Sequence, residues 1–230
     1  MAKENPTTKK VLRIGHRGAA GHAPENTLRS IEEAIALRCD LIEVDVRRTR
    51  DGALVLLHDE RVDRTTNGKG AVAEMTLKDL RTLDADGGQH VPTLQEALQV
   101  ANGRVGLILE LKASGIGEQV CALVQEAGFT SPVIYASFLH EELLSLREPA
   151  PTAATMALFK KHLEDPVVSV KNALATHAGL RFDTATKPLV NDLHRAGRQV
   201  FVYTVNKPKD IQRVRGLGVD GIISDFPDRI

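Results

Sequence analysis

Acidic side chains alternate with apolar ones in two short β-rich runs of this sequence. In Leu41–Val46, strand geometry puts Glu43 and Asp45 on one face, because successive side chains of a strand point to opposite sides. In the run 107–112 the same rule puts Glu110 and Lys112 on one face. The opposite faces are apolar and suit packing under helices, so the acids should point into an interior, where an unpaired charge is costly.

Three carboxylates that meet at one mouth would suit a divalent cation. Carboxylate oxygens without a cysteine ligand favour a hard ion, Mg²⁺ or Ca²⁺, over zinc. The alternative is that these acids form salt bridges with Arg17, Arg47 or Lys112. The residue types alone leave both interpretations open.

Two histidines lie at positions where they could serve the same mouth. His16 and Arg17 follow the first β-rich run in Gly15-His16-Arg17-Gly18, whose glycines we expect to let a ligand approach the backbone. His58 ends a predicted hairpin. Histidines beside carboxylates and cations suit phosphate ester chemistry, in which one takes a proton and the other gives one. The six histidines to which we assign no role are His22, His90, His140, His162, His177 and His194.

The elements that must position these residues alternate along the chain. Short β-rich runs and amphipathic stretches predict a parallel sheet with crossover helices, and eight strands fit a TIM (β/α)8 barrel better than an open sheet. We predict strands near Val11–Gly15, Leu41–Val46, Val105–Leu111, Pro132–Ala136, Ala153–Leu158, Leu180–Phe182, Gln199–Val205 and Val219–Ile223. Helices are predicted near Thr27–Leu37, Leu94–Ala101, Ile116–Ala127, His140–Arg147, Pro166–Thr176, Pro188–Ala196 and Pro208–Leu217, the first capped by Asn26.

Two irregularities interrupt this pattern. The segment from about 47 to 92 is too long for a simple link, and Arg50-Asp51-Gly52 looks like a turn, so we predict a small inserted hairpin or subdomain after strand 2. Only six residues follow Ser224, too few for an eighth crossover helix. The predicted organisation is a polar tail over residues 1–10 and one barrel domain over residues 11–230.

Composition predicts a globular protein. Of the 230 residues, 42% are hydrophobic and 26% charged, and 30 basic side chains balance 30 acidic ones, so no overall field would attract nucleic acid or an anionic membrane. No apolar run approaches the ~20 residues of a membrane span, and no signal peptide is recognisable. We therefore expect a cytoplasmic protein. Cys39 and Cys121 are interpreted as buried apolar residues.

The ordered motifs of the chain resemble those of the glycerophosphodiester phosphodiesterase family. The resemblance rests on five motifs: His16-Arg17-Gly18, Pro24-Glu25-Asn26-Thr27, Glu43-Val44-Asp45, His58-Asp59 and Glu110-Leu111-Lys112. It continues through Asp63-Arg64-Thr65-Thr66, Pro92-Thr93-Leu94, Ser137-Phe138, 203–206 and 218–225. Single motifs are nonspecific, but five in this order with these spacings are not expected by chance, and with the further segments the resemblance covers nearly the whole chain.

This resemblance implies a role for each candidate residue. Glu43, Asp45 and Glu110 would bind the divalent metal, His16 would act as general base and His58 as general acid. Arg17 and Lys112 would hold the phosphate. Glu25 would orient the site, the alternative being that it merely leads into a helix N-terminus.

The implied reaction is hydrolysis of a small-molecule glycerophosphodiester to sn-glycerol 3-phosphate and an alcohol. One alternative is a lysophospholipase D-like phosphodiesterase, against which the absence of an apolar anchor argues. Another is a non-catalytic sugar-phosphate-binding barrel, since a fold alone does not fix a function. The oligomeric state does not follow from the sequence.

The chain departs from the family pattern at Tyr203, where many relatives carry tryptophan. Tyr203 alternates with Phe201 and Val205, so it is interpreted either as a wall of the substrate pocket or as a core aromatic. The segment between His58 and Pro92 is short for the family, and the mouth should therefore be more open.

Overall fold

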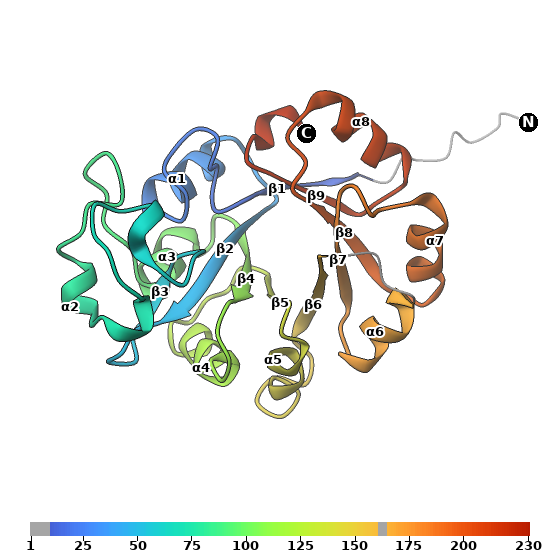
Figure 1. The fold of residues 1–230 in the computed structure, drawn as a ribbon. Helices are drawn as coiled ribbons and strands as arrows, with labels where there is room; N and C mark the ends of the chain where they lie inside the picture. The colour runs from blue at the N-terminus through green and yellow to red at the C-terminus, as the bar shows by residue number, and fades with distance from the viewer. Residues whose placement is uncertain (1–9, 161–164) are drawn as a thin grey trace, which may run out of the picture.

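Eight parallel strands close into a barrel that is surrounded by helices (Figure 1). The computed structural model describes residues 10–160 and 165–230. The barrel strands are β1 (Leu12–Gly15), β2 (Leu41–Arg48), β4 (Gly106–Leu111), β5 (Val133–Ser137), β6 (Ala154–Phe159), β7 (His177–Arg181), β8 (Gln199–Tyr203) and β9 (Gly221–Ser224). The predicted TIM barrel is confirmed.

Direct strand pairing closes the barrel without an eighth crossover helix. β1 pairs in parallel with β2 through Ile14 and Leu41, and with β9 through Ile14 and Ile223. A short 3-10 helix, Pro227–Arg229, follows β9 where a full helix would otherwise pack. The short final segment is therefore compatible with closure, since the ladder hydrogen bonds lie between strands rather than between helices.

Seven helices join successive barrel strands in the described part of the chain. They are α1 (Leu28–Ala36), α3 (Leu94–Ala101), α4 (Gly117–Glu126), α5 (His140–Ser145), α6 (Pro166–Asn172), α7 (Lys187–Arg195) and α8 (Pro208–Gly216). The predicted cap of the first helix is wrong: the side chain of Thr27, not Asn26, accepts the hydrogen bond from the Ser30 amide. Asn26 instead turns toward the barrel interior, with a φ of 57°.

The predicted strand near Leu180–Phe182 begins too late, because β7 starts at His177. Histidine and glycine in His177-Ala178-Gly179 weaken the local strand pattern. The barrel requires this glycine, since a Cβ at residue 179 would lie 2.4 Å from Cδ2 of Leu158 on β6. Close packing between neighbouring strands therefore fixes a position whose residue type does not itself favour a strand.

The alternation of β2 and β4 separates two cores as predicted. Ile42, Val44 and Val46 pack outward against α1 and α3, whereas Leu41 and Ile108 face the barrel interior. Glu43 and Glu110 come two residues later on the inward faces, so the interior is apolar at the N-terminal ends of the strands and charged toward their C-terminal ends. Active sites of such barrels occupy the C-terminal end.

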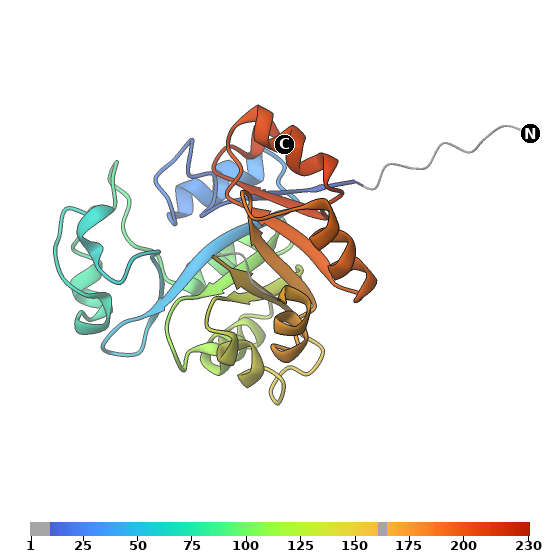
Figure 2. The same ribbon diagram turned by 45° about the vertical axis from the view of Figure 1, so that its right-hand side comes forward.

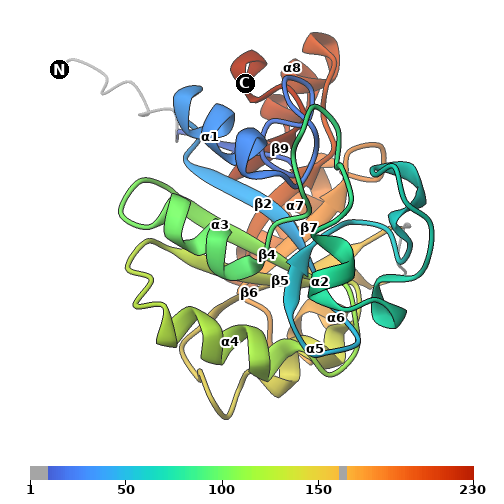
Figure 3. The same ribbon diagram turned by 90° about the vertical axis from the view of Figure 1, so that its left-hand side faces the viewer.

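The insertion between β2 and α3 forms a small unit beside the barrel (Figures 2 and 3). It contains β3 (Leu54–Leu56), the 3-10 helices η1 (Val62–Arg64) and η2 (Val72–Glu74), and α2 (Leu77–Leu80). β3 pairs antiparallel with the far end of β2, as the predicted hairpin requires. A separate apolar cluster that includes Val62, Val72 and Leu80 fills the insertion.

Four further predictions concern His162, the polar tail, the two cysteines and membrane-spanning helices. His162 and all of the predicted polar tail except Lys10 lie outside the described residues. Cys39 and Cys121 are both buried free thiols, as predicted. Among residues 10–160 and 165–230, no helix combines the length and apolar content that crossing a bilayer demands.

Candidate active site

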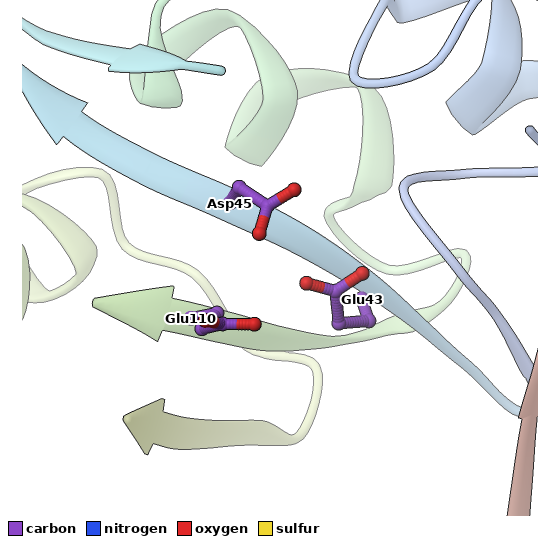
Figure 4. Close-up of side chains that lie close together, drawn as sticks. All are labelled: Glu43, Asp45 and Glu110. Carbon is purple, nitrogen blue, oxygen red and sulfur yellow. The ribbon is translucent and has the colours of Figure 1, made fainter. Parts of the chain in front are cut away.

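Three buried carboxylates converge at the C-terminal mouth of the barrel (Figure 4). Glu43 and Asp45 project from β2, and Glu110 projects from the adjacent β4, whose register pairs it with Asp45. One oxygen from each carboxylate lies within 4.8 Å of the others. The exposed fractions are only 4%, 1% and 9% for Glu43, Asp45 and Glu110, so their charges are largely shielded from water.

Basic residues neutralise part of this cluster. Nζ of Lys112 donates to Oε1 of Glu110 at 2.6 Å and lies 3.2 Å from Oδ1 of Asp45, while Nε of Arg17 lies 3.4 Å from Oδ2 of Asp45. Arg47 instead donates to the carbonyl oxygens of His58 and Lys112. Arg17 and Lys112 therefore form the ion pairs with the acids that were considered from the sequence, whereas Arg47 contacts backbone carbonyls.

Two buried carboxylate oxygens of the cluster have no hydrogen-bond partner in the described chain, Oε1 of Glu43 and Oδ1 of Asp45, and the latter lies 3.2 Å from Nζ of Lys112. The other oxygen of Glu43, Oε2, accepts a hydrogen bond from the Arg17 amide at 2.9 Å. Burial, followed by repulsion from Asp45, raises the pKa of Glu43. Burial alone would raise the pKa of Asp45, but the positive charges of Lys112 and Arg17 outweigh burial, so that this pKa lies below its usual value. An unsatisfied buried carboxylate oxygen beside two more carboxylates fits a hard divalent cation.

His16 lies at the rim of the cluster, immediately after β1. Its Nδ1 lies 2.6 Å from Oδ1 of Asp225, and its Nε2 lies 3.9 Å from Oε2 of Glu43. Burial alone would lower the pKa of His16, but the hydrogen bond to Asp225 and the charge of Glu43 outweigh burial, so that this pKa lies above its usual value. Nε2 therefore faces the carboxylate cluster.

His58 lies at the other side of the mouth, two residues after the hairpin strand β3. Its Nδ1 lies 2.6 Å from Oδ1 of Asp59, which repeats the pairing of His16 with Asp225. Burial of the half-buried ring lowers the pKa of His58. Oδ2 of Asp59 accepts a hydrogen bond from Nε of Arg64 at 2.6 Å, so the orienting carboxylate is itself held.

The loop after β1 wraps tightly around the site. A Cβ at Gly18, whose φ is 86°, would lie 2.2 Å from Oγ of Ser30, so this glycine is needed for contact with α1 rather than for ligand approach. Asn26 donates from Nδ2 to Oδ2 of Asp45 at 2.8 Å and accepts from the Asp45 amide at 3.1 Å. Glu25 accepts from Nη1 of Arg17 at 2.7 Å.

Two pockets adjoin the cluster. A small inner pocket is lined by His16, Glu43, Glu110 and aromatic residues that include Tyr203. A wider outer pocket of about 710 Å³ is lined by His58, Glu110 and Lys112, among others. The Tyr203 hydroxyl donates to the carbonyl of Phe159 at 2.7 Å while the ring borders the inner pocket, an arrangement that favours the pocket-wall interpretation.

Several partners of these side chains were not singled out from the sequence. Asp59, Asp225 and Asn26 each belong to a motif of the resemblance, yet no role in the active site was assigned to them. Asn206 donates to Oδ2 of Asp225 at 2.6 Å. A polar residue within two positions of the end of a predicted strand, such as Asp225, was the available signal, because barrel strands end at the active site.

Comparisons with known proteins agree with this geometry. A model of the glycerophosphoryl diester phosphodiesterase family matches residues 16–229. A glycerophosphodiester phosphodiesterase of Caldanaerobacter subterraneus is 34% identical over an alignment that covers 96% of this chain and 96% of the relative.

Two solved structures are also similar. A glycerophosphodiester phosphodiesterase of Agrobacterium tumefaciens has a TM-score of 0.85 and 32% identity, over 96% of this chain and 98% of that one. An Oleispira antarctica phosphodiesterase in complex with the product sn-glycerol-3-phosphate has a TM-score of 0.88 and 29% identity, over 94% of each chain. The chain described here therefore belongs to the glycerophosphoryl diester phosphodiesterase family.

Proposed function

We propose that this enzyme hydrolyses glycerophosphodiesters to sn-glycerol 3-phosphate and an alcohol, with a divalent cation held by Glu43, Asp45 and Glu110. The observation that carries the proposal is the buried carboxylate cluster with its unsatisfied Glu43 oxygen, flanked by His16 and His58. The product bound to the Oleispira antarctica relative supports the same substrate class.

The two pockets suggest how the substrate lies. The inner pocket has a volume of only about 20 Å³, room for little more than one water. We therefore assign the phosphate to the carboxylate cluster between the pockets, with its glycerol at the entrance of the inner pocket beside His16 and Tyr203. The departing alcohol is assigned to the outer pocket beside His58, which is wide enough for headgroups of different sizes.

The proton transfers follow from this placement. Nε2 of His16, oriented by Asp225, takes the proton from the attacking oxygen, and His58, oriented by Asp59, gives a proton to the alcohol as its bond to phosphorus breaks. Arg17 and Lys112 stabilise negative charge on the phosphate, and Glu25 holds the Arg17 guanidinium in place. A bound divalent cation would supply further positive charge at the phosphate oxygens.

A direct test compares two substrates with and without a chelator. We expect release of sn-glycerol 3-phosphate from glycerophosphocholine, loss of that activity in excess chelator, and recovery on addition of Mg²⁺ or Ca²⁺. Preferential turnover of lysophosphatidylcholine would instead identify a lysophospholipase D-like activity. Binding of sn-glycerol 3-phosphate without turnover of either substrate would identify a non-catalytic barrel.

The roles of the histidines can be separated by the leaving group. An alkoxide leaves poorly without a proton, whereas a nitrophenolate leaves readily as an anion. We therefore expect His58→Ala to lose about 100- to 10,000-fold in turnover of glycerophosphocholine and much less with a nitrophenyl ester of glycerol phosphate. His16→Ala should be impaired on both substrates alike. If the two variants exchange these patterns, the acid and the base are reversed.

A further inference from the structure

Arg64 joins the insertion to the loop that follows β1. Its Nη1 donates to Oε2 of Glu25 and its Nη2 to Oε1, both at 2.8 Å, so the two side chains form a bidentate ion pair. Its Nε donates to Oδ2 of Asp59 at 2.6 Å. Such forked pairs fix direction as well as distance, because the guanidinium is planar and its donors have fixed geometry. One side chain thus holds two carboxylates from different parts of the fold.

Both carboxylates lead to residues of the site. Asp59 contacts Nδ1 of His58 at 2.6 Å, and Glu25 accepts from Arg17, whose Nε lies 3.4 Å from Asp45. A continuous chain of ionic contacts therefore runs from the carboxylate cluster on β2, through the β1 loop, to the proposed general acid. Arg64 is the link that crosses from the barrel to the insertion.

The part of the insertion that carries Arg64 has its own apolar cluster, whereas the backbone of His58 is held directly to β2. The Leu57 amide donates to the Asp45 carbonyl at 3.0 Å, and Arg47 donates to the His58 carbonyl at 2.7 Å. Val62, at the start of η1, belongs to the insertion's own apolar cluster and anchors Arg64 there. Beside the ion pair, a pocket of about 460 Å³ lined by Glu25, Arg64 and Asp84, among others, separates the insertion from the β1 loop. The contacts with β2 fix the backbone of His58, and the direction of its ring depends on the pairing of Nδ1 with Asp59, which Arg64 holds.

The ion pairs of Arg64 contribute little to the stability of the fold. The Arg64 side chain is 49% exposed, and exposed ion pairs contribute little to the free energy of folding. Their effect on the orientation of the His58 ring matters more, because proton transfer needs the imidazole within hydrogen-bond reach of the departing oxygen.

We propose that Arg64 is a positioning residue for His58: through Asp59 it fixes the ring, and through Glu25 it fixes the ring's place relative to the carboxylate cluster. This inference rests on the proposed acid role of His58. It requires that loss of Arg64 impair chiefly the proton transfer that loss of His58 abolishes, because Arg17 keeps its own contact with Glu25.

The test is a double-mutant cycle on the full-length enzyme. We expect Arg64→Gln to lower turnover of glycerophosphocholine by up to about 100-fold, as small displacements of a catalytic group do, with a much smaller loss on a nitrophenyl ester of glycerol phosphate. The double variant His58→Ala/Arg64→Gln should be no slower on glycerophosphocholine than His58→Ala, because residues that act as one unit are not additive. Arg64→Lys should be intermediate, since an ammonium lacks the fork.

Arg81→Gln is the matched control. Arg81 also joins the insertion to the barrel, through an ion pair of 2.7 Å with Glu96 of α3, but it touches no residue of the site. This variant should match the wild type on both substrates, and thermal unfolding of every variant reports any general loss of stability.

Three outcomes overturn the positioning role. They are equal losses on both substrates for Arg64→Gln, additive losses in the double variant, and a His58→Ala variant with no dependence on the leaving group. A wild-type enzyme that hydrolyses no glycerophosphodiester would instead refute the proposed function itself.

Discussion

Nδ1 of His16 lies 2.6 Å from Oδ1 of Asp225, across the seam where the first and last strands of the barrel pair. Asn206, which follows β8, donates to the other oxygen of Asp225 at 2.6 Å. Three neighbouring strands therefore orient one imidazole ring, and the closure of the barrel completes the proposed base.

Replacing Asp225 by asparagine tests this pairing. Asp225→Asn retains the shape but loses the charge that fixes the ring tautomer, so the maximal turnover should fall on the order of 100-fold or more. Since the Asp225 hydrogen bond raises the pKa of His16 against the opposing effect of burial, its loss should lower that pKa. A base is active when neutral, so the acidic limb of kcat/KM should move to lower pH. Movement to higher pH would contradict the assignment.

Removal of one carboxylate tests the metal site. Glu110→Gln keeps the side-chain shape but removes a charge and frees Lys112, so Mg²⁺ or Ca²⁺ affinity measured by calorimetry should fall at least about tenfold while the fold is retained. Glu126→Gln, on the far end of α4, is the control and should bind the ion like the wild type. Unchanged affinity in Glu110→Gln would favour the interpretation of these acids as a salt-bridge network.

Lys112→Met should distinguish transition-state stabilisation from simple binding. The ammonium faces Asp45 and Glu110 at the mouth of the barrel, and its charge should matter most as negative charge builds on the phosphate. Turnover should therefore fall by a larger factor than KM rises. A raised KM with unchanged kcat would make Lys112 a substrate-binding residue only.

His177 should make stability depend on pH independently of the active site. Its ring is buried against Phe201, and burial lowers its pKa below the unfolded value of 6.5. The unfolded chain then binds a proton first as the pH falls below 6.5, so the free energy of unfolding should decrease, by at most ~1.4 kcal/mol per pH unit for one proton. In urea unfolding, His177→Gln should show a shallower dependence between pH 7 and 5. An identical slope would exclude this contribution.

Local patterns in the sequence were sufficient for the barrel and for much of the candidate site. Alternation in β2 and β4 is a property of each strand alone, so the inward direction of Glu43, Asp45 and Glu110 could be predicted from their neighbours. The βα repeat with eight strands favoured a barrel over an open sheet, and the turn at Arg50-Asp51-Gly52 predicted the hairpin that carries His58. Each of these inferences depends on residues that lie close together in the chain.

Only the tertiary structure decided which distant residues meet. Asp225 lies 209 residues from His16 and reaches it because β9 pairs with β1, and Arg64 reaches Glu25 because the insertion folds back over the β1 loop. Asn26 carries a helix-cap residue type, yet it bonds Asp45 because the loop buries it beside β2. Periodicity determines the face of a strand, but the partners of a side chain depend on strand order and loop packing, which residue type and spacing do not encode.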